Sequence, residues 1–361
     1  MKIKERALLF EDYKPRTQLV REEHIPEKAR HPVVESHNHL FGEPKPEDMV
    51  EIMDKIGVRV FVNLTGNSKF TFIEKGYSAS PRNIDYFFEN YVQKYPDRFI
   101  CFTMSDFANT SDKTLIKDSH FAEKAIRHME EDIKKGARGL KILKELGLRF
   151  RDKSGKIVRV DDERLFPIWE RAGELGVPVL IHTTDPAGFF HPVDMHNEHY
   201  PTLVTAPGWS FHGSYYSKEQ LLEQRDRMIS LHPKTTFICA HVANFAENLG
   251  YVSAFLDSHQ NAYMDFSARI DELGRQPYSA REFMIKYQDR ILFGTDMPLK
   301  ADAFRAYFRF LETGDEYFDY PDYLGRAGYG RWGIYGLYLP DQVLKKIYHK
   351  NACKVIPGLK I

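Results

Sequence analysis

Short apolar runs alternate with amphipathic segments along the chain after Pro32. Eight of these runs have the length and the β-branched or aliphatic content of buried strands. They lie at residues 33–36, 58–64, 99–104, 139–143, 178–182, 236–241, 262–266 and 291–294. Runs that are apolar throughout, rather than alternating, are typical of strands in a parallel sheet that helices cover. The pattern therefore predicts eight parallel strands.

Amphipathic segments between these runs predict helices at residues 46–56, 82–94, 121–135, 167–175, 218–231, 280–287 and 301–311. Gly57, Gly136 and Gly176 follow three of them, where a left-handed cap is favoured. Eight strand-and-helix units indicate an α/β fold of the (β/α)₈ TIM-barrel type. We expect residues 1–31 to form an N-terminal arm and residues 32–361 to form a single barrel. Its two long aromatic-rich loops, at 183–217 and 314–339, are expected to wall a pocket.

Composition restricts the class of partner. Lys plus Arg and Asp plus Glu both number 51, so no basic field predicts nucleic-acid binding. No run reaches the roughly 18 apolar residues of a membrane span, and the chain does not start like a signal peptide. Three cysteines are too few for a disulfide framework or a cysteine-based zinc site. We expect a cytoplasmic protein with a small-molecule substrate, although a removed signal peptide would leave the same sequence. The oligomeric state is open, and a homo-oligomer is compatible with the sequence.

The first predicted strand ends in a His-x-His motif, His37-Asn38-His39. Side chains two residues apart on a strand point to the same side, so these two imidazoles can converge. Neutral imidazole is the commonest metal ligand in proteins. Taken alone, the motif is more often a pair of hydrogen-bonded histidines than a metal site.

Further polar side chains interrupt the apolar runs at the same end. His182 ends the fifth run, His241 ends the sixth and Asp296 follows the eighth, while Lys141 lies late in the fourth. Barrel enzymes build their active sites at the carboxyl ends of the strands. Several histidines and an aspartate at one end of a barrel therefore predict a metal site there.

These motifs resemble those of the amidohydrolase superfamily, and more narrowly the amidohydrolase 2 group, which is similar to the amino-carboxymuconate-semialdehyde decarboxylases and related lactonases. The resemblance spans residues 32–357. It rests on segments 35–40 (ESHNHL), 179–182 (VLIH), 239–241 (CAH), 294–298 (GTDMP) and 347–352 (IYHKNA).

The resemblance implies one divalent metal held by four side chains, His37, His39, His182 and Asp296. Zinc suits such ligands best, and manganese is the alternative. It also implies that His241 lies close to the reacting water and that Asp296 moves the proton. With this ligand set a hydrolase would open a lactone, amide or ester by means of an activated water. The alternative is a non-oxidative decarboxylase, a carbon–carbon lyase, because both activities occur among relatives.

Three further residues are candidates for substrate binding. Lys141 could bind an anionic substrate; a role as carboxylated bridge to a second metal is not expected, because the resemblance is to the one-metal group. Arg269 could grip a substrate carboxylate with two hydrogen bonds, or pair with Asp265 or Asp271. Trp209, in the first long loop, is expected in the pocket wall. For the histidines of that loop, exposed or hydrogen-bonded roles are expected rather than metal ligation: His191, His196, His199 and His212.

Two other classes of protein share parts of this pattern. Metal-dependent deoxyribonucleases also carry a His-x-His and a Thr-Asp-x-Pro, but they are expected to have Glu where this chain has Lys141. The zero net charge also offers no phosphate-binding field. A barrel-shaped binding protein that kept the site only as scaffold is the non-catalytic alternative, and the completeness of the ligand set argues against it.

Overall fold

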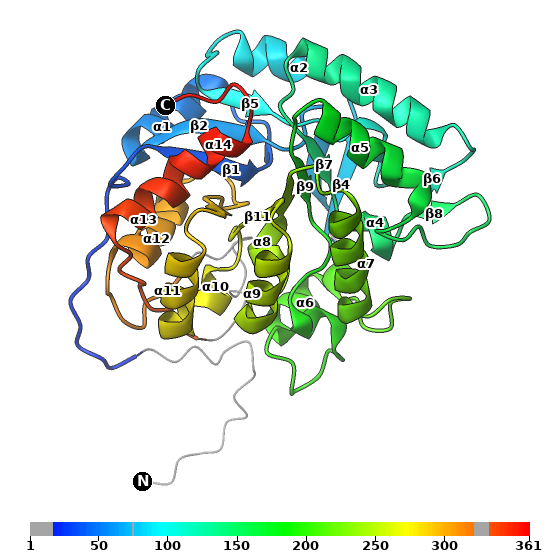
Figure 1. The fold of residues 1–361 in the computed structure, drawn as a ribbon. Coiled ribbons are helices and arrows are strands. Elements are labelled where there is room, and N and C mark those ends of the chain that lie inside the picture. Colours follow the sequence, from blue (N-terminus) through cyan, green and yellow to red (C-terminus); the bar gives the residue numbers. More distant parts are fainter. Residues whose placement is uncertain (1–16, 74–75, 321–331) are drawn as a thin grey trace.

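A computed structural model describes residues 17–73, 76–320 and 332–361. Eight parallel strands form its centre, and helices surround them (Figure 1). The strands are β1 (Val33–Asn38), β2 (Val58–Asn63), β5 (Phe99–Cys101), β7 (Leu140–Ile142), β9 (Val179–Ile181), β10 (Phe237–Cys239), β11 (Ala262–Asp265) and β12 (Ile291–Leu292). Each overlaps one of the eight predicted runs.

The strands follow one another around the barrel in sequence order. Hydrogen bonds join β1, β2 and β5 into one sheet and β7, β9, β10, β11 and β12 into a second. A parallel bridge between Thr103 and Leu140 links β5 to β7. At the other junction, the Ser36 amide donates to Phe293 O (2.9 Å) and the Asp296 amide donates to His37 O (2.8 Å). The two sheets thus meet on both sides, which confirms the predicted (β/α)₈ barrel.

Most of the covering helices coincide with predicted segments. They are α1 (Pro46–Ile56), α2 (Asp85–Phe87), α3 (Phe121–Lys135), α5 (Phe166–Glu174), α7 (Lys218–Leu231), α9 (Leu249–Ser258), α11 (Pro277–Lys286), α12 (Ala301–Glu312), α13 (Asp341–Lys345) and α14 (Asn351–Val355). Gly57, with φ 88°, ends α1 in the left-handed conformation expected of it. The sequence interpretation missed α9, because Gly250 and the β-branched Val252 weaken its helical signal. Its Asn248 cap, which accepts from the Tyr251 amide, is the signal that marks it.

Two hydrophobic layers hold the barrel together. Inside it, Val34, Val62, Leu180, Ile238 and Leu292 pack against one another and are fully buried. A larger layer lies between the strands and the helices. Alternate side chains of each strand supply the two layers, which explains why the strand sequences are apolar throughout.

An antiparallel hairpin that the sequence interpretation did not anticipate follows β2. It consists of β3 (Ser68–Ile73) and β4 (Gly76–Pro81). Phe70 and Phe72 alternate with polar residues in β3, which is the period-two signal of a half-buried strand. The hairpin carries aromatic side chains to the carboxyl end of the barrel, which is hereafter called the mouth.

The N-terminal segment contacts the barrel through backbone hydrogen bonds. The Ala29 amide donates to Ile56 O (3.0 Å), and the His24 amide donates to Asp315 Oδ2 (2.7 Å). Smaller elements complete the chain: β6 (Thr114–Ile116), β8 (Arg151–Asp152), α4 (Glu145–Leu148), α6 (Tyr200–Thr205), α8 (Ala240–Ala243) and α10 (Ile270–Gly274). Among the described residues, no helix has the length and apolar character needed to span a membrane.

Candidate metal centre at the barrel mouth

Three of the predicted site residues converge at the mouth. One ligand atom from each of His37, His39 and Asp296 lies within 4.8 Å of the other two. His37 and His39 come from the end of β1, and Asp296 follows β12 in the loop that begins Thr295-Asp296. Both histidines are at most 4% exposed. Closure of the barrel between β1 and β12 is what brings these distant parts of the sequence together.

Asp296 has the properties of a metal ligand. Its Oδ1 atom is buried without a hydrogen-bond partner among the described residues, and it lies 3.6 Å from His39 Nε2. Burial raises the pKa of Asp296, although the charges of His37 and Lys141 oppose this. Its backbone is left-handed, with φ 53°, an uncommon conformation that clusters at functional sites. Two imidazoles and a carboxylate with an unpaired oxygen fit a divalent transition-metal ion.

His241 faces this cluster from α8. Its Nδ1–H donates to Ser267 O (2.7 Å), so Nε2 is the free nitrogen, and this nitrogen lies 3.9 Å from Asp296 Oδ2. Burial lowers the pKa of His241 well below its usual value, and nearby His182 and Arg269 act in the same direction. The neutral imidazole can therefore accept a hydrogen bond or a proton through Nε2.

Asp265, which the sequence interpretation considered only as a partner for Arg269, orients His37. Its Oδ2 accepts a hydrogen bond from His37 Nδ1 (2.8 Å) and thereby leaves His37 Nε2 for a ligand. Burial raises the pKa of Asp265, but the charge of His37 and hydrogen bonds from His37 and Ser267 outweigh it and hold the pKa at about 2. No local motif marks this residue, since its importance depends on β11 lying beside β10 and β12.

Replacing Asp265 with asparagine is expected to weaken divalent-metal binding by about 10- to 100-fold, because the His37 ring loses its anionic anchor. Titration with Mn²⁺ or Zn²⁺ followed by calorimetry measures the change. The exposed Asp257, which pairs with Lys286 on the outer surface, provides the matched control Asp257→Asn. Equal affinities in the two variants would contradict the orienting role.

His182 lies beside this cluster but outside the group that converges within 4.8 Å. Its ring is 4.4 Å from that of His241, and its Nε2 lies 3.1 Å from Thr184 O and 3.3 Å from Asp185 Oδ1. Burial is the main cause that lowers its pKa to about 3. Ligation by His182 therefore remains a prediction, whereas its position at the mouth agrees with the sequence.

Lys141 lies at the bottom of the site. Its Nζ is 3.3 Å from His37 Nε2, and the side chain is fully buried. Burial lowers its pKa to about 8, although Asp296 and Asp265 oppose the change. The amine therefore faces His37, and Lys141 is not among the residues that line the pocket.

A pocket opens above the cluster, with aromatic walls and charged side chains on its rim. Phe70 stacks on the His39 ring at 4.5 Å, and Trp209, which the sequence predicted as a wall residue, is almost completely buried. Further lining residues are Phe72, Tyr77, Phe189, Lys144, Asp185, Arg269 and Asp296. The hairpin residues Phe70, Phe72 and Tyr77 were absent from the sequence interpretation, which did not include a hairpin.

Charged groups of the pocket are partly paired. Lys144 Nζ lies 2.5 Å from Asp185 Oδ2, and Arg269 Nη2 lies 3.7 Å from Asp185 Oδ1. Arg269 thus pairs with Asp185 instead of Asp265 or Asp271, the two partners considered from the sequence. Both cations lie near this one carboxylate, and the charges of Glu272 and Asp271 also act on Arg269.

The first long loop supplies Asp185, Phe189 and Trp209 to the pocket wall, whereas the described residues of the second loop do not line the pocket. In residues 183–217, His191, His196 and His212 are exposed, whereas His199 is buried against Phe189 and Trp332. Of residues 314–339, the part from 321 to 331 lies outside the described residues.

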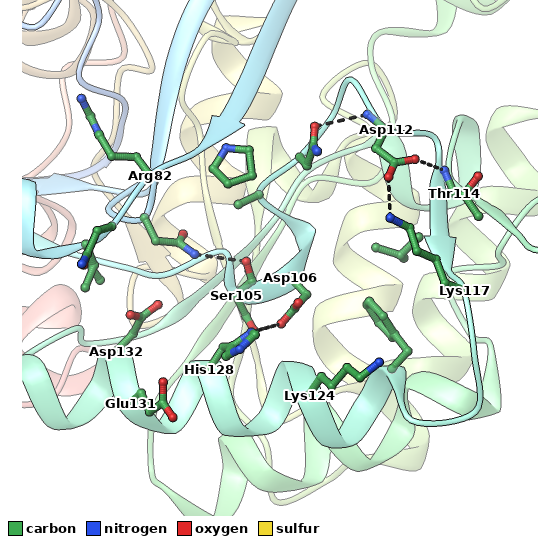
Figure 2. Close-up of a pocket in the computed structure, with 18 of the residues that line it drawn as sticks. Arg82, Ser105, Asp106, Asp112, Thr114, Lys117, Lys124, His128, Glu131 and Asp132 are labelled. Atoms are coloured by element: carbon green, nitrogen blue, oxygen red, sulfur yellow. Dashed lines mark hydrogen bonds and ion pairs between the residues drawn. The ribbon is translucent and has the colours of Figure 1, made fainter.

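A separate pocket of about 680 Å³ lies away from the mouth, beside α3 (Figure 2). It is strongly charged, but its cations are paired, most of them within the pocket and Arg82 and Lys135 with Glu43 and Asp85 beside it. Lys117 lies 2.7 Å from Asp112, and His128 lies 2.7 Å from Asp106. Lys124 similarly lies 2.8 Å from Asp118. The mouth, with its unpaired Asp296 oxygen and converging imidazoles, is therefore the candidate centre.

Comparisons with known proteins show the family and the fold of the chain. The amidohydrolase family model matches residues 91–357, while no curated protein sequence matches the chain. A putative amidohydrolase from Staphylococcus aureus is similar in structure, with 17% identity, a TM-score of 0.54 and coverage of 90% of this chain and 99% of that one.

Two decarboxylases share the same fold. The 2,6-dihydroxybenzoate decarboxylase from Rhizobium has 14% identity and a TM-score of 0.54, and the match covers 90% of this chain and 98% of that one. A dihydroxybenzoic acid decarboxylase from Polaromonas sp. JS666, solved with bound manganese and the inhibitor 2-nitroresorcinol, has 16% identity and a TM-score of 0.53. The match covers 90% of this chain and 96% of that one.

Proposed function

This chain belongs to the amidohydrolase family, and we propose that it is a metal-dependent enzyme that hydrolyses a small organic substrate at the barrel mouth. The observation that carries the proposal is the convergence of His37, His39 and Asp296 within 4.8 Å, with Asp296 Oδ1 unpaired.

The metal would be held by His37, His39 and Asp296, with His182 as the further ligand that the family resemblance implies. A divalent ion bound there lowers the pKa of water toward about 7 and polarises a carbonyl group. Zinc is the ion that these ligands suit best, and manganese, which the Polaromonas enzyme binds, is the alternative.

The protein's own side chains supply the proton chemistry. Asp296 can accept a proton from the attacking water and deliver it to the leaving group, because its Oδ1 makes no competing hydrogen bond among the described residues. His241 Nε2, 3.9 Å from Asp296 Oδ2, can orient the water or the substrate oxygen. Asp265 fixes His37, and Phe70 covers His39 and limits entry of bulk water.

The pocket above the site supports a small, planar and anionic substrate. Trp209, Phe70 and Tyr77 offer flat apolar walls, and Arg269 and Lys144 offer cations that a carboxylate can reach. Ester, lactone or amide bonds of such acids are the proposed targets.

Decarboxylation is the second candidate, and the same pocket favours it. A carboxylate held by Arg269 or Lys144 beside the metal ligands would lie where loss of CO₂ is assisted, with protonated Asp296, whose pKa burial raises, giving its proton to the adjacent carbon. The two decarboxylases that share the fold act on aromatic acids of the size that aromatic walls suit.

Product analysis distinguishes the two reactions. Purified protein loaded with Zn²⁺ or Mn²⁺ is incubated in H₂¹⁸O with a panel of lactones, esters, amides and hydroxybenzoic acids, and the products are identified by mass spectrometry. Incorporation of ¹⁸O into the product supports hydrolysis. Release of CO₂ without incorporation supports the lyase, and absence of turnover for both classes would contradict the proposal.

A further inference from the structure

The turn that carries His241 has an unusual backbone. Four consecutive non-glycine residues after β10, from His241 to Asn244, have positive φ values between 48° and 60°. A left-handed turn of L-residues brings each Cβ too close to the following carbonyl oxygen, so it persists only when surrounding contacts hold it. The contacts that hold this turn therefore determine where the His241 ring lies.

A buried lysine from the preceding helix, α7, contacts this turn. Lys218, the first residue of α7, is 2% exposed, and its Nζ donates to Asn244 O (2.5 Å) and to Asp185 O (2.5 Å). Thr184 Oγ1 lies 3.3 Å from the same nitrogen. The three donors of the ammonium group thus meet acceptors from two different loops, one after β9 and one after β10.

The Asn244 side chain joins the same two loops. Its Oδ1 accepts from the Thr183 amide (3.1 Å), and its Nδ2 donates to Thr184 O (2.7 Å). Arg225, about two turns further along α7, donates to Ala243 O (2.5 Å). A capping box at Ser217 and Gln220 fixes the start of α7 and therefore fixes the backbone position of Lys218.

From these contacts we infer that Lys218 is a positioning residue, which clamps the loop bearing Asp185 to the turn bearing His241. It lies outside the pocket lining and reaches the reacting groups only through the backbone at 185 and 244. Its ammonium group holds His241 Nε2 opposite Asp296 and holds the Asp185 carboxylate between Lys144 and Arg269. The catalytic part of this inference rests on the proposed function, whereas the clamp itself does not.

Amide hydrogen exchange of the full chain tests the clamp without any substrate. In Lys218→Met, peptides covering residues 182–187 and 240–248 should exchange at least about tenfold faster, because their shared charged hydrogen bonds are lost. Lys218→Arg keeps the charge, but its planar guanidinium group does not match three acceptors that converge on one nitrogen. We therefore expect exchange rates between those of the wild type and Lys218→Met. If Lys218→Met does not fold, the exchange rates of Lys218→Arg in these two peptides alone test the clamp.

Gln224→Met is the matched control on the same helix. Gln224 is also buried, and its side chain accepts from the Val160 amide, which belongs to neither loop. This variant should lose stability without faster exchange at 182–187 and 240–248. Equal exchange in these peptides for wild type, Lys218→Met and Lys218→Arg would overturn the clamp, as would equal acceleration in Gln224→Met.

A kinetic measurement tests the catalytic consequence. With a substrate found by product analysis, Lys218→Met should lower kcat about tenfold or more while metal content stays at the wild-type value, and Lys218→Arg should restore part of the loss. Faster exchange with unchanged kcat would overturn the positioning role. A wild-type protein without turnover would count against the proposed function alone, since the exchange result still decides the clamp.

Discussion

Replacing Asp296 with asparagine should lower kcat by about 10²- to 10⁴-fold, the range associated with loss of a general acid or base. The amide cannot accept the proton of the attacking water, and its oxygen carries no full charge for a cation. The structure motivates this variant directly, since Asp296 Oδ1 is unpaired and lies between His39 and the open pocket.

Steady-state kinetics together with metal analysis measure this effect. Asp302→Asn is the control, because Asp302 lies in the first turn of α12 with its side chain 97% exposed. If Asp296→Asn keeps its metal but loses turnover, Asp296 acts in proton transfer. If the variant loses both the metal and turnover, Asp296 is also a metal ligand. Turnover within about twofold of wild type would remove Asp296 from the mechanism.

Replacing His39 with alanine should weaken divalent-metal binding by at least about 100-fold. Loss of a group that only supports a metal ligand weakens binding by up to about 100-fold, and loss of a ligand itself should cost at least as much. The His39 ring lies between Asp296 and the stacked Phe70, so its removal also leaves a gap in the wall of the pocket. Metal content after dialysis, measured by plasma mass spectrometry, reports the change.

His212→Ala provides the comparison for His39→Ala. His212 belongs to the first long loop and is exposed, with one long contact from Nδ1 to Phe190 O (3.4 Å). Its loss should leave the metal content at the wild-type value. Equal metal content in both variants would mean that the ion is held elsewhere.

The barrel could be predicted because its signals are local. Each strand is a short apolar run, and Gly57 marks a helix end through a backbone conformation that glycine favours. Placement of His37, His39 and Asp296 at strand ends then followed from the rule that barrel sites lie at the carboxyl end. Prediction of these residues required only the order of the strands and no detail of side-chain packing.

The remainder of the site depends on contacts between distant segments. Asp265 orients His37 across 228 positions of sequence, and no local pattern distinguishes it from any other aspartate at a strand end. The left-handed turn at His241 contains no glycine, so the sequence gives no local signal for it. Hydrogen bonds from Lys218 and Arg225 hold the turn instead. Conformations that tertiary contacts impose against local preference are those that sequence patterns miss.

The central claim is that a divalent ion binds at the barrel mouth, and anomalous X-ray scattering tests it most directly. Crystals of the full chain are grown with saturating Mn²⁺ or Zn²⁺, and data are collected on both sides of the absorption edge of the metal. We expect a strong anomalous peak in contact with His37, His39 and Asp296. A map without a peak at these residues, from crystals that bind the metal elsewhere or not at all, would contradict the account.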